Sequence, residues 1–174
     1  MDCGLKLGLC TVSGMTEPTL VLRPVEARDL DHFFAQQRDP VARQMAAFTS
    51  ADGDDRAAFD AHWARIMGEP GIVNRTIEFG GVVVGHVASF EQGGEREVTY
   101  WIARAHWGRG IATRALRLAL AELPTRPLHA RAAADNVGSI RVLTHCGFVV
   151  CGADRGFARA RGAEVDEVLL RLDA

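Results

Sequence analysis

Apolar and polar positions change their period along the chain, and these changes divide it into strands and helices. Runs of alternating positions separated by Gly80-Gly81 and Gly93-Gly94 predict three antiparallel strands joined by tight turns. After Gly110, apolar residues recur at steps of three and four up to Leu123, which predicts an amphipathic helix that Pro124 ends. The predicted strands are 19–25, 72–79, 82–90, 97–103, 128–134, 148–151 and 164–172, and the other predicted helices are 29–37, one starting at 39–40, 57–67 and 136–146.

This order of elements predicts an α/β (α+β) fold. A meander followed by strand, helix, strand, helix and strand favours a mixed, largely antiparallel central sheet with helices on both faces. Residues 16–174 contain no repeat or low-complexity segment, and we expect them to form one domain. Residues 1–15 are weakly patterned, and we expect a disordered leader there. Asp29 is the expected N-cap of the first helix.

Composition and charge limit the classes of partner that the chain could bind. Hydrophobic residues make up 48% of the chain and charged residues 24%, as in ordinary globular proteins. A net charge of −2 argues against nucleic-acid binding, and no apolar run approaches the roughly 20 residues of a membrane helix. None of the four cysteines forms a C-x-x-C pair, so we expect free thiols in a reducing, cytoplasmic compartment. The scattered histidines predict no metal site.

The supply of basic residues restricts how the chain could bind phosphate. Lys6 is the only lysine, so a P-loop is excluded and a phosphate site must use backbone amides and arginine. The segment 107–113 offers such amides between a predicted strand and a predicted helix. Gly108 and Gly110 allow a sharp turn, and the free N–H groups of a helix N-terminus attract anions. A plain turn remains the alternative interpretation of this segment.

Neighbouring motifs give this segment a family context. The sequence resembles the Gcn5-related N-acetyltransferase (GNAT) superfamily, whose signature Q/R-x-x-G-x-G/A opens a helix. Here Trp107 occupies the first position, with Gly110 and Ala112 in register. Tryptophan departs from the superfamily pattern but resembles the "W-G-x-G-x-A-T" form of the ribosomal-protein N-terminal acetyltransferase (Rim-type) branch. The strand at 97–102 also resembles that branch.

A second signature lies downstream. Residues 136–143, followed by Cys146-Gly147-Phe148, are similar to the family's "N-x-x-S-x-x-V-L … G-F". The resemblance covers about residues 19–172 and implies a GNAT acyltransferase fold that uses acetyl-CoA as co-substrate, without a metal. It implies that the following residues bind CoA through backbone or side chain: Trp101, Ile102, Ala103, Trp107, Gly108, Arg109, Gly110, Ile111, Ala112, Thr113, Asn136 and Ser139.

The resemblance implies roles within that set. The amides of 109–113 would hold the pyrophosphate, the backbone of 101–103 would pair with the pantetheine arm, and Asn136 would hydrogen-bond to it. Arg109 could equally be a solvated side chain, and Asn136 a simple N-cap.

The resemblance leaves the catalytic groups less defined. Many family members protonate the leaving thiolate with a tyrosine at the position that is Leu143 here. Ser139 is therefore the first candidate acid, or alternatively a small residue that permits close approach of CoA. Glu97 is the first candidate for the base that deprotonates the attacking amine, with Glu91 and His86 in reserve. A covalent route through Cys146 is disfavoured because no base is evident beside it.

The expected activity is acetyl transfer to a primary amine, on a small molecule or a protein N-terminus, within a ternary complex. The alternative is a non-catalytic acyl-CoA-binding or regulatory module; a dinucleotide-binding fold is disfavoured because a third glycine is missing. The sequence leaves open whether the chain forms a homodimer. Arginines in the tract before the last strand could receive an acidic acceptor or lie in solvent. The residues concerned are Arg155, Arg159 and Arg161, and the resemblance implies an acceptor pocket containing Phe33, Phe34, Met45, Phe48 and Trp63.

Overall fold

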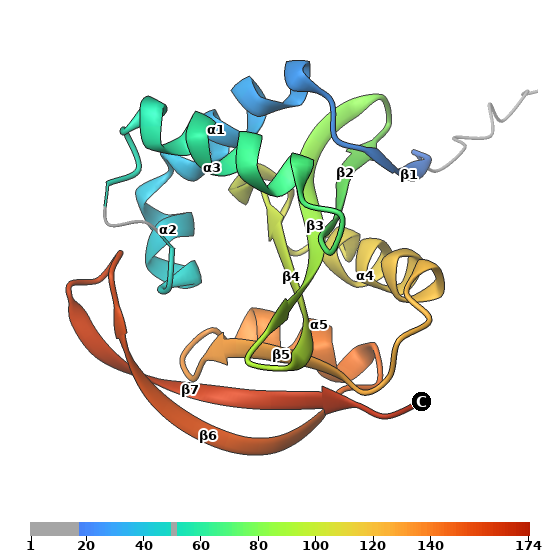
Figure 1. Ribbon diagram of the computed structural model, residues 1–174, viewed down its shortest axis with the longest axis vertical. Helices are drawn as coiled ribbons and strands as arrows, with labels where there is room; N and C mark the ends of the chain where they lie inside the picture. Colours follow the sequence, from blue (N-terminus) through green and yellow to red (C-terminus); the bar gives the residue numbers. More distant parts are fainter. Residues whose placement is uncertain (1–17, 50–51) are drawn as a thin grey trace, which may run out of the picture.

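The three-strand meander lies at the centre of a seven-stranded sheet of order β1-β2-β3-β4-β5-β7-β6 (Figure 1). The computed structural model describes residues 18–49 and 52–174, so the leader predicted at 1–15 lies outside the described residues. β4 and β5 run parallel, and the other neighbouring strands are antiparallel. The strands are β1 (Leu20–Pro24), β2 (Val73–Phe79), β3 (Val82–Gln92), β4 (Glu95–Ile102), β5 (Leu128–Ala133), β6 (Val149–Ala158) and β7 (Ala163–Leu172).

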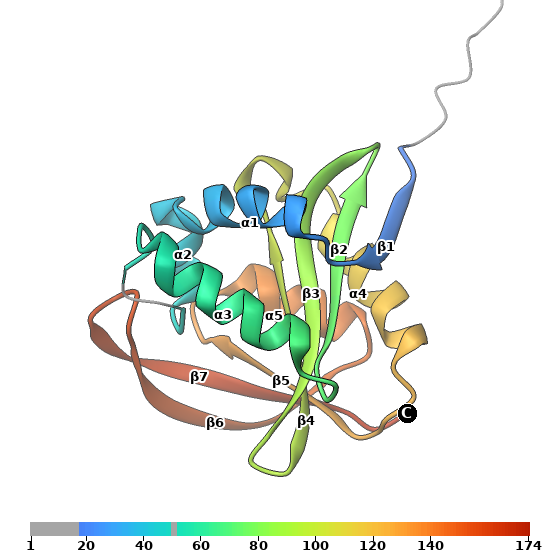
Figure 2. The same ribbon diagram turned by 45° about the horizontal axis from the view of Figure 1, so that its top comes forward.

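Helices cover both faces of the sheet, as predicted (Figure 2). Alternation along β3 explains how, because neighbouring residues of a strand point to opposite faces. Val87 belongs to the core beneath α4 and α5, whereas the His86 ring packs against Phe33 of α1 and Trp63 of α3. The helices are α1 (Leu30–Gln37), α2 (Pro40–Ala46), α3 (Arg56–Gly68), α4 (Ile111–Glu122) and α5 (Val137–His145), with 3-10 turns at η1 (Ala27–Asp29) and η2 (Arg104–His106).

Asp29 occupies the N-cap position of α1, as predicted, but its side chain has a different role. Its carboxylate does not cap α1; it accepts from Arg23 at 2.7 and 2.8 Å, from Thr76 Oγ1 at 2.7 Å and from the Glu26 amide at 2.9 Å. The side chain is only 1% exposed, so these contacts are made away from water. Asp29 therefore ties the start of α1 to β1 and β2, a role that depends on strand pairing rather than on local sequence.

The strand expected to open at 148–151 extends well beyond these residues. β6 continues to Ala158 and pairs with β7, so all three arginines named above lie in the β6–β7 hairpin. The backbone is continuous with the sheet because ladder hydrogen bonds with β7 outweigh the polar side chains of the segment. Arg155 lies within β6, and Arg159 and Arg161 lie in the turn that follows it.

Asp29 makes folding stability depend on pH. Burial opposes its ionisation, but the hydrogen bonds from Arg23, Glu26 and Thr76 outweigh burial and lower the pKa of Asp29 to about 2. A lowered carboxyl pKa contributes stability above the unfolded value, and this is lost as pH falls through the folded value. We predict that Asp29→Asn lowers the free energy of unfolding at neutral pH by about 2 kcal/mol and flattens its fall between about pH 4 and pH 2.

Urea unfolding of both proteins across this pH range measures the effect. Asp31→Asn is the matched control, because Asp31 is an exposed carboxylate whose ion pair with Arg56 contributes at most about 1 kcal/mol. Equal acid sensitivity of wild type and Asp29→Asn would contradict the assignment.

Candidate active site

The site is built around the point where β4 parts from β5. These strands share one register pair, Glu97 with His129, whereas the other edge of β5 pairs with β7 along its whole length. In Figure 1 the rest of β4 rises away from β5. A cavity of about 1010 Å³ occupies this region, lined by residues 97–101 of β4 and 130–133 of β5. The sheet is therefore opened at its centre rather than at an edge.

The backbone of β4 turns alternate residues toward β3 and toward this opening. The Ala103 amide donates to Val84 O at 2.8 Å, so Ala103 faces β3. The Trp101 carbonyl also faces β3, because a Cβ added to Gly85 would lie 1.9 Å from it. Glycine at position 85 is thus required by the close approach of β4.

Ile102 faces the other way. Alternation along an antiparallel ladder directs Tyr100 and Ile102 toward β5 when Trp101 and Ala103 face β3. The indole Nε1–H of Trp107 donates to the Ile102 carbonyl at 2.7 Å, which agrees with this direction. Among the three residues expected to pair with pantetheine, Ile102 is the one whose backbone faces the opening.

The predicted anion site lies where α4 begins. Gly110 is the N-cap residue with φ +71°, and the first helical bond runs from Arg114 N to Gly110 O at 3.1 Å. The amides of Ile111, Ala112 and Thr113 precede that bond, so they lack intrahelical partners. A Cβ added to Gly110 would meet nothing within 4 Å, so no other part of the described chain fills the space beside this glycine.

Arginine side chains flank these amides. Arg109 and Arg114 place their guanidinium groups 5.2 and 5.6 Å from the centre of the Phe79 ring. Arg109 Nη1 also lies 3.2 Å from His106 Nδ1. Arginine on the turn and on the first helical turn adds positive charge to the helix dipole at this point.

Asn136 is the N-cap residue of α5, which is one of the two roles expected for it. Its Oδ1 accepts from the Ser139 amide at 3.0 Å, and its Nδ2 donates to the Met45 carbonyl at 3.0 Å. Both ends of the side chain are therefore used within the chain, and they fix the start of α5 against the end of α2. This contact keeps Ser139 at the cavity.

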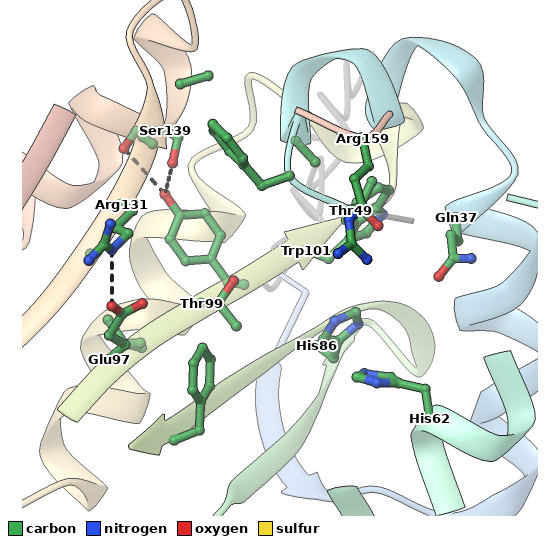
Figure 3. Close-up of a pocket in the computed structure, with 18 of the residues that line it drawn as sticks. Gln37, Thr49, His62, His86, Glu97, Thr99, Trp101, Arg131, Ser139 and Arg159 are labelled. Carbon is green, nitrogen blue, oxygen red and sulfur yellow. Dashed lines mark hydrogen bonds and ion pairs between the residues drawn. The ribbon is translucent and has the colours of Figure 1, made fainter. Parts of the chain in front are cut away.

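A tyrosine that the sequence interpretation did not use bridges the opening. Tyr100 on β4 reaches α5, where its hydroxyl lies 2.8 Å from Ser139 Oγ and 3.2 Å from the Ser139 carbonyl (Figure 3). Burial raises the pKa of Tyr100 to about 12, despite the hydrogen bond with Ser139, so the phenol is protonated at neutral pH. Leu143 is 1% exposed and lines the same cavity.

Arg131, which lines the cavity, contacts two buried carboxylates. Arg131 Nε lies 3.1 Å from Glu97 and Arg131 Nη1 lies 3.8 Å from Glu167, both of which are buried. Burial raises the pKa of Glu167, and Arg131 opposes the shift. Glu97 therefore lies at the cavity, but it forms an ion pair with Arg131. Glu167 is a second buried carboxylate at the cavity, which was not predicted from the sequence.

The reserve candidates are placed less favourably. Glu91 is exposed on β3 and is absent from the cavity lining. His86 lines the cavity, but burial lowers its pKa to about 4, so it is neutral and weakly basic at physiological pH. Burial raises the pKa of the Cys146 thiol, whose Sγ lies 3.6 Å from the Thr113 carbonyl, so Cys146 is a poor nucleophile.

Aromatic side chains form the wall toward α1 and α3. Phe33, Phe48 and Trp63 line the cavity, whereas Phe34 packs against Phe59, with ring centres 5.1 Å apart, and is not in the lining. Met45 contributes its carbonyl to Asn136.

Sequence signals existed for two of the residues that were missed. Tyr100 is the only tyrosine of the chain and lies two residues before Ile102. Glu167 lies two residues after Val165 and is therefore on the same face of its strand. This spacing was a signal for a carboxylate that points inward. Within residues 18–49 and 52–174, no group of three metal-ligating side chains is present. No helix in these ranges combines the length and apolarity needed to cross a membrane.

Solved structures with the same fold are numerous. No curated protein sequence matches the chain. Spermidine N-acetyltransferase from Vibrio cholerae, in complex with CoA and spermine, is 18% identical, with 88% of this chain and 95% of that chain covered and a TM-score of 0.75. RimJ from Mycobacterium smegmatis, in complex with CoA-disulfide, is 24% identical, with 89% and 82% covered and a TM-score of 0.75. The microcin C7 self-immunity acetyltransferase MccE, in complex with acetyl-CoA and AMP, is 14% identical, with 89% and 92% covered and a TM-score of 0.76.

The family follows from a match that covers most of the chain. The family model described as the acetyltransferase (GNAT) domain matches residues 19–149, which span β1 to the start of β6 and include the opened sheet and the start of α4. The chain belongs to the GNAT acetyltransferase family.

Proposed function

We propose that this chain is an N-acetyltransferase that transfers the acetyl group of acetyl-CoA to a primary amine within a ternary complex. The observation that carries the proposal is the opening between β4 and β5, where a cavity holds a protonated tyrosine, together with the unpartnered amides at the start of α4, the helix that follows β4. Acetyl-CoA would supply an activated thioester. Holding the amine beside the thioester would be the main contribution of the protein.

The binding half of the proposal rests on backbone groups. The amides of Ile111, Ala112 and Thr113 suit the pyrophosphate, because free N–H groups and the helix dipole both favour an anion. Arg109 and Arg114 add charge from the side. The Ile102 backbone facing the opening suits an extended arm that would pair with β4 like an added strand.

The catalytic half rests on Tyr100 and Ser139. During transfer the C–N bond forms as the C–S bond breaks, and the leaving thiolate needs a proton. Ser139 would donate it and be reprotonated by Tyr100, whose hydroxyl lies 2.8 Å from Ser139 Oγ. Tyr100 on β4 would thus replace the tyrosine that many family members have at the α5 position occupied here by Leu143. Glu167 or Glu97 would accept the amine proton, directly or through water.

Three observations bear on the identity of the acceptor and on whether the chain is catalytic. The RimJ structure and the Trp107 motif support the Rim-type branch, in which a protein N-terminus is an acceptor. The spermidine N-acetyltransferase structure supports a small amine. The contact of Glu97 with Arg131, together with leucine at position 143, favours the alternative of a non-catalytic acyl-CoA-binding module. Turnover of acetyl-CoA with a broad amine panel separates catalysis from binding alone.

The proposed pyrophosphate site predicts a charge effect at Gly110. Gly110→Asp should weaken acetyl-CoA binding at least about tenfold, because a carboxylate would face the pyrophosphate. Gly110→Asn is the matched control, since asparagine has the same shape and also tolerates φ +71° but carries no charge. Calorimetric titration measures both affinities, and equal affinities for the two variants would exclude this location.

The Tyr100–Ser139 pair predicts a loss of rate rather than of affinity. Ser139→Ala and Tyr100→Phe should each lower kcat by about 100-fold, the usual effect of removing an acid catalyst, with acetyl-CoA affinity little changed. The Ser139 amide still reaches Asn136 in Ser139→Ala, so α5 stays capped. Parallel loss of affinity and kcat would assign Ser139 to cofactor contact alone.

The proton on Tyr100 can be observed directly. Because Tyr100 is the only tyrosine, tyrosinate absorbance reports this residue alone. The unfolded chain should titrate near pH 10 and the folded chain near pH 12, since burial raises the pKa. Stability should therefore fall as pH rises from about 10 toward 12. A folded-state midpoint near 10 would show that the phenol is not buried as described.

A further inference from the structure

The three arginines of the β6–β7 hairpin have different partners. Arg155 pairs with Glu164 at 3.1 Å, and Arg161 binds Asp135 through both terminal nitrogens at 2.7 and 2.9 Å. Arg159 lies between them and forms no ion pair or hydrogen bond with the described residues. It lines the cavity, and Figure 3 shows its side chain pointing into it.

The backbone on either side of Arg159 is anchored. Ala158 is fully buried, and the Ala160 amide donates to the Ala47 carbonyl at 3.2 Å. Arg161 Nε donates to the Gln44 carbonyl at 2.7 Å. Anchors on both sides reduce the conformational freedom of the turn, so the direction of Arg159 is set by the fold rather than by a loose loop.

Polar atoms without hydrogen-bond partners lie in the same cavity. Trp101 Nε1 and His86 Nδ1 are buried and have no hydrogen-bond partner within the described structure. Both residues line the cavity. An indole N–H can only donate, and a buried donor without a partner costs about 1–3 kcal/mol, so a ligand acceptor is expected there.

The carboxylates of the cavity are engaged elsewhere. Asp55 accepts from the Ala58 amide at 2.9 Å, and Asp52 accepts from the Asp54 amide at 2.8 Å. Glu97 and Glu167 face Arg131. Among the described residues that line the cavity, Arg131 has carboxylate partners, and Arg159 is the arginine without an ion-pair partner.

We propose that the acceptor is a small primary amine that also carries a carboxylate or phosphonate, as in an amino acid, and that Arg159 binds this anionic group. The assignment rests on the proposed acetyl transfer and names its substrate class. The planar guanidinium matches either anion through two parallel hydrogen bonds. The aromatic wall of Phe33, Phe48 and Trp63 would contact the rest of the acceptor.

Matched pairs of acceptors test the assignment. The probes are L-phenylalanine and L-leucine, their α-carboxamides, the 1-aminophosphonate analogue of phenylalanine, and spermidine. Each is measured by acetyl-CoA-dependent thiol release and by calorimetric binding in the presence of CoA. The acid-to-amide ratio is compared between protein variants, so that the difference in amine pKa between acid and amide cancels.

The variants separate Arg159 from its neighbours. Arg159→Gln should lower the acid-to-amide ratio of kcat/KM at least about tenfold, the loss expected for a charge-assisted hydrogen bond. Arg159→Lys should retain part of the preference. Arg155→Gln is the control, because Arg155 lies in the same hairpin but pairs with Glu164, and it should leave the ratio unchanged. Acetyl-CoA affinity should be equal in all four proteins.

The outcomes distinguish this inference from the proposed function. Preferential binding of acids that depends on Arg159, without any thiol release, would support the anion site and overturn catalysis. Acetylation of spermidine or of carboxamides with no effect of Arg159→Gln would support catalysis and overturn the anion site. Binding of none of the anionic probes would also overturn it. A larger effect with the phosphonate than with the acids would assign the anion as phosphonate.

Discussion

The parting of β4 from β5 is the constraint on which the rest of the molecule depends. A parallel pair normally continues as a ladder, but here it is limited to Glu97 and His129, while the other edge of β5 stays paired with β7 along its whole length. Backbone groups of β4 that a ladder would satisfy instead face a cavity. Polar backbone groups at the centre of a sheet need partners, so a ligand that supplies them is favoured. The start of α4 lies just beyond the same strand, with its own unpartnered amides.

Long-range side-chain contacts hold this opening in shape. Tyr100 spans it from β4 to Ser139, and Arg131 spans it from β5 to Glu97. The Tyr100 contact is buried, and a hydrogen bond in low-dielectric surroundings is stronger than in water, whereas the Arg131 side chain is 36% exposed. The cavity lining is chemically divided. Hydroxyl groups lie beside α5, Glu97 and Glu167 lie beside Arg131, and aromatic side chains and Arg159 line another part.

Local features could be predicted from the sequence, and long-range pairings could not. The helix at α4 and the Asn136 cap follow from spacing and residue type within a few positions, and the meander follows from its glycine turns. Tyr100 and Ser139 are 39 residues apart, so their contact depends on strand register and on where α5 lands. Asp29 and Thr76 are 47 residues apart, so the local sequence could not show that the Asp29 side chain binds β2 instead of capping α1. Glu167 needed the order of β5, β7 and β6 to be known.

Backbone amide chemical shifts during a titration of the isotope-labelled protein with acetyl-CoA test the central claim most directly. Ligand binding in the opened sheet, with its pyrophosphate on α4, predicts the largest shifts at Ile111, Ala112 and Thr113 and at Ile102 on β4. Amides of the β2–β3 turn at Gly80-Gly81 should change little. Saturable binding that leaves the start of α4 and Ile102 unshifted would contradict the account.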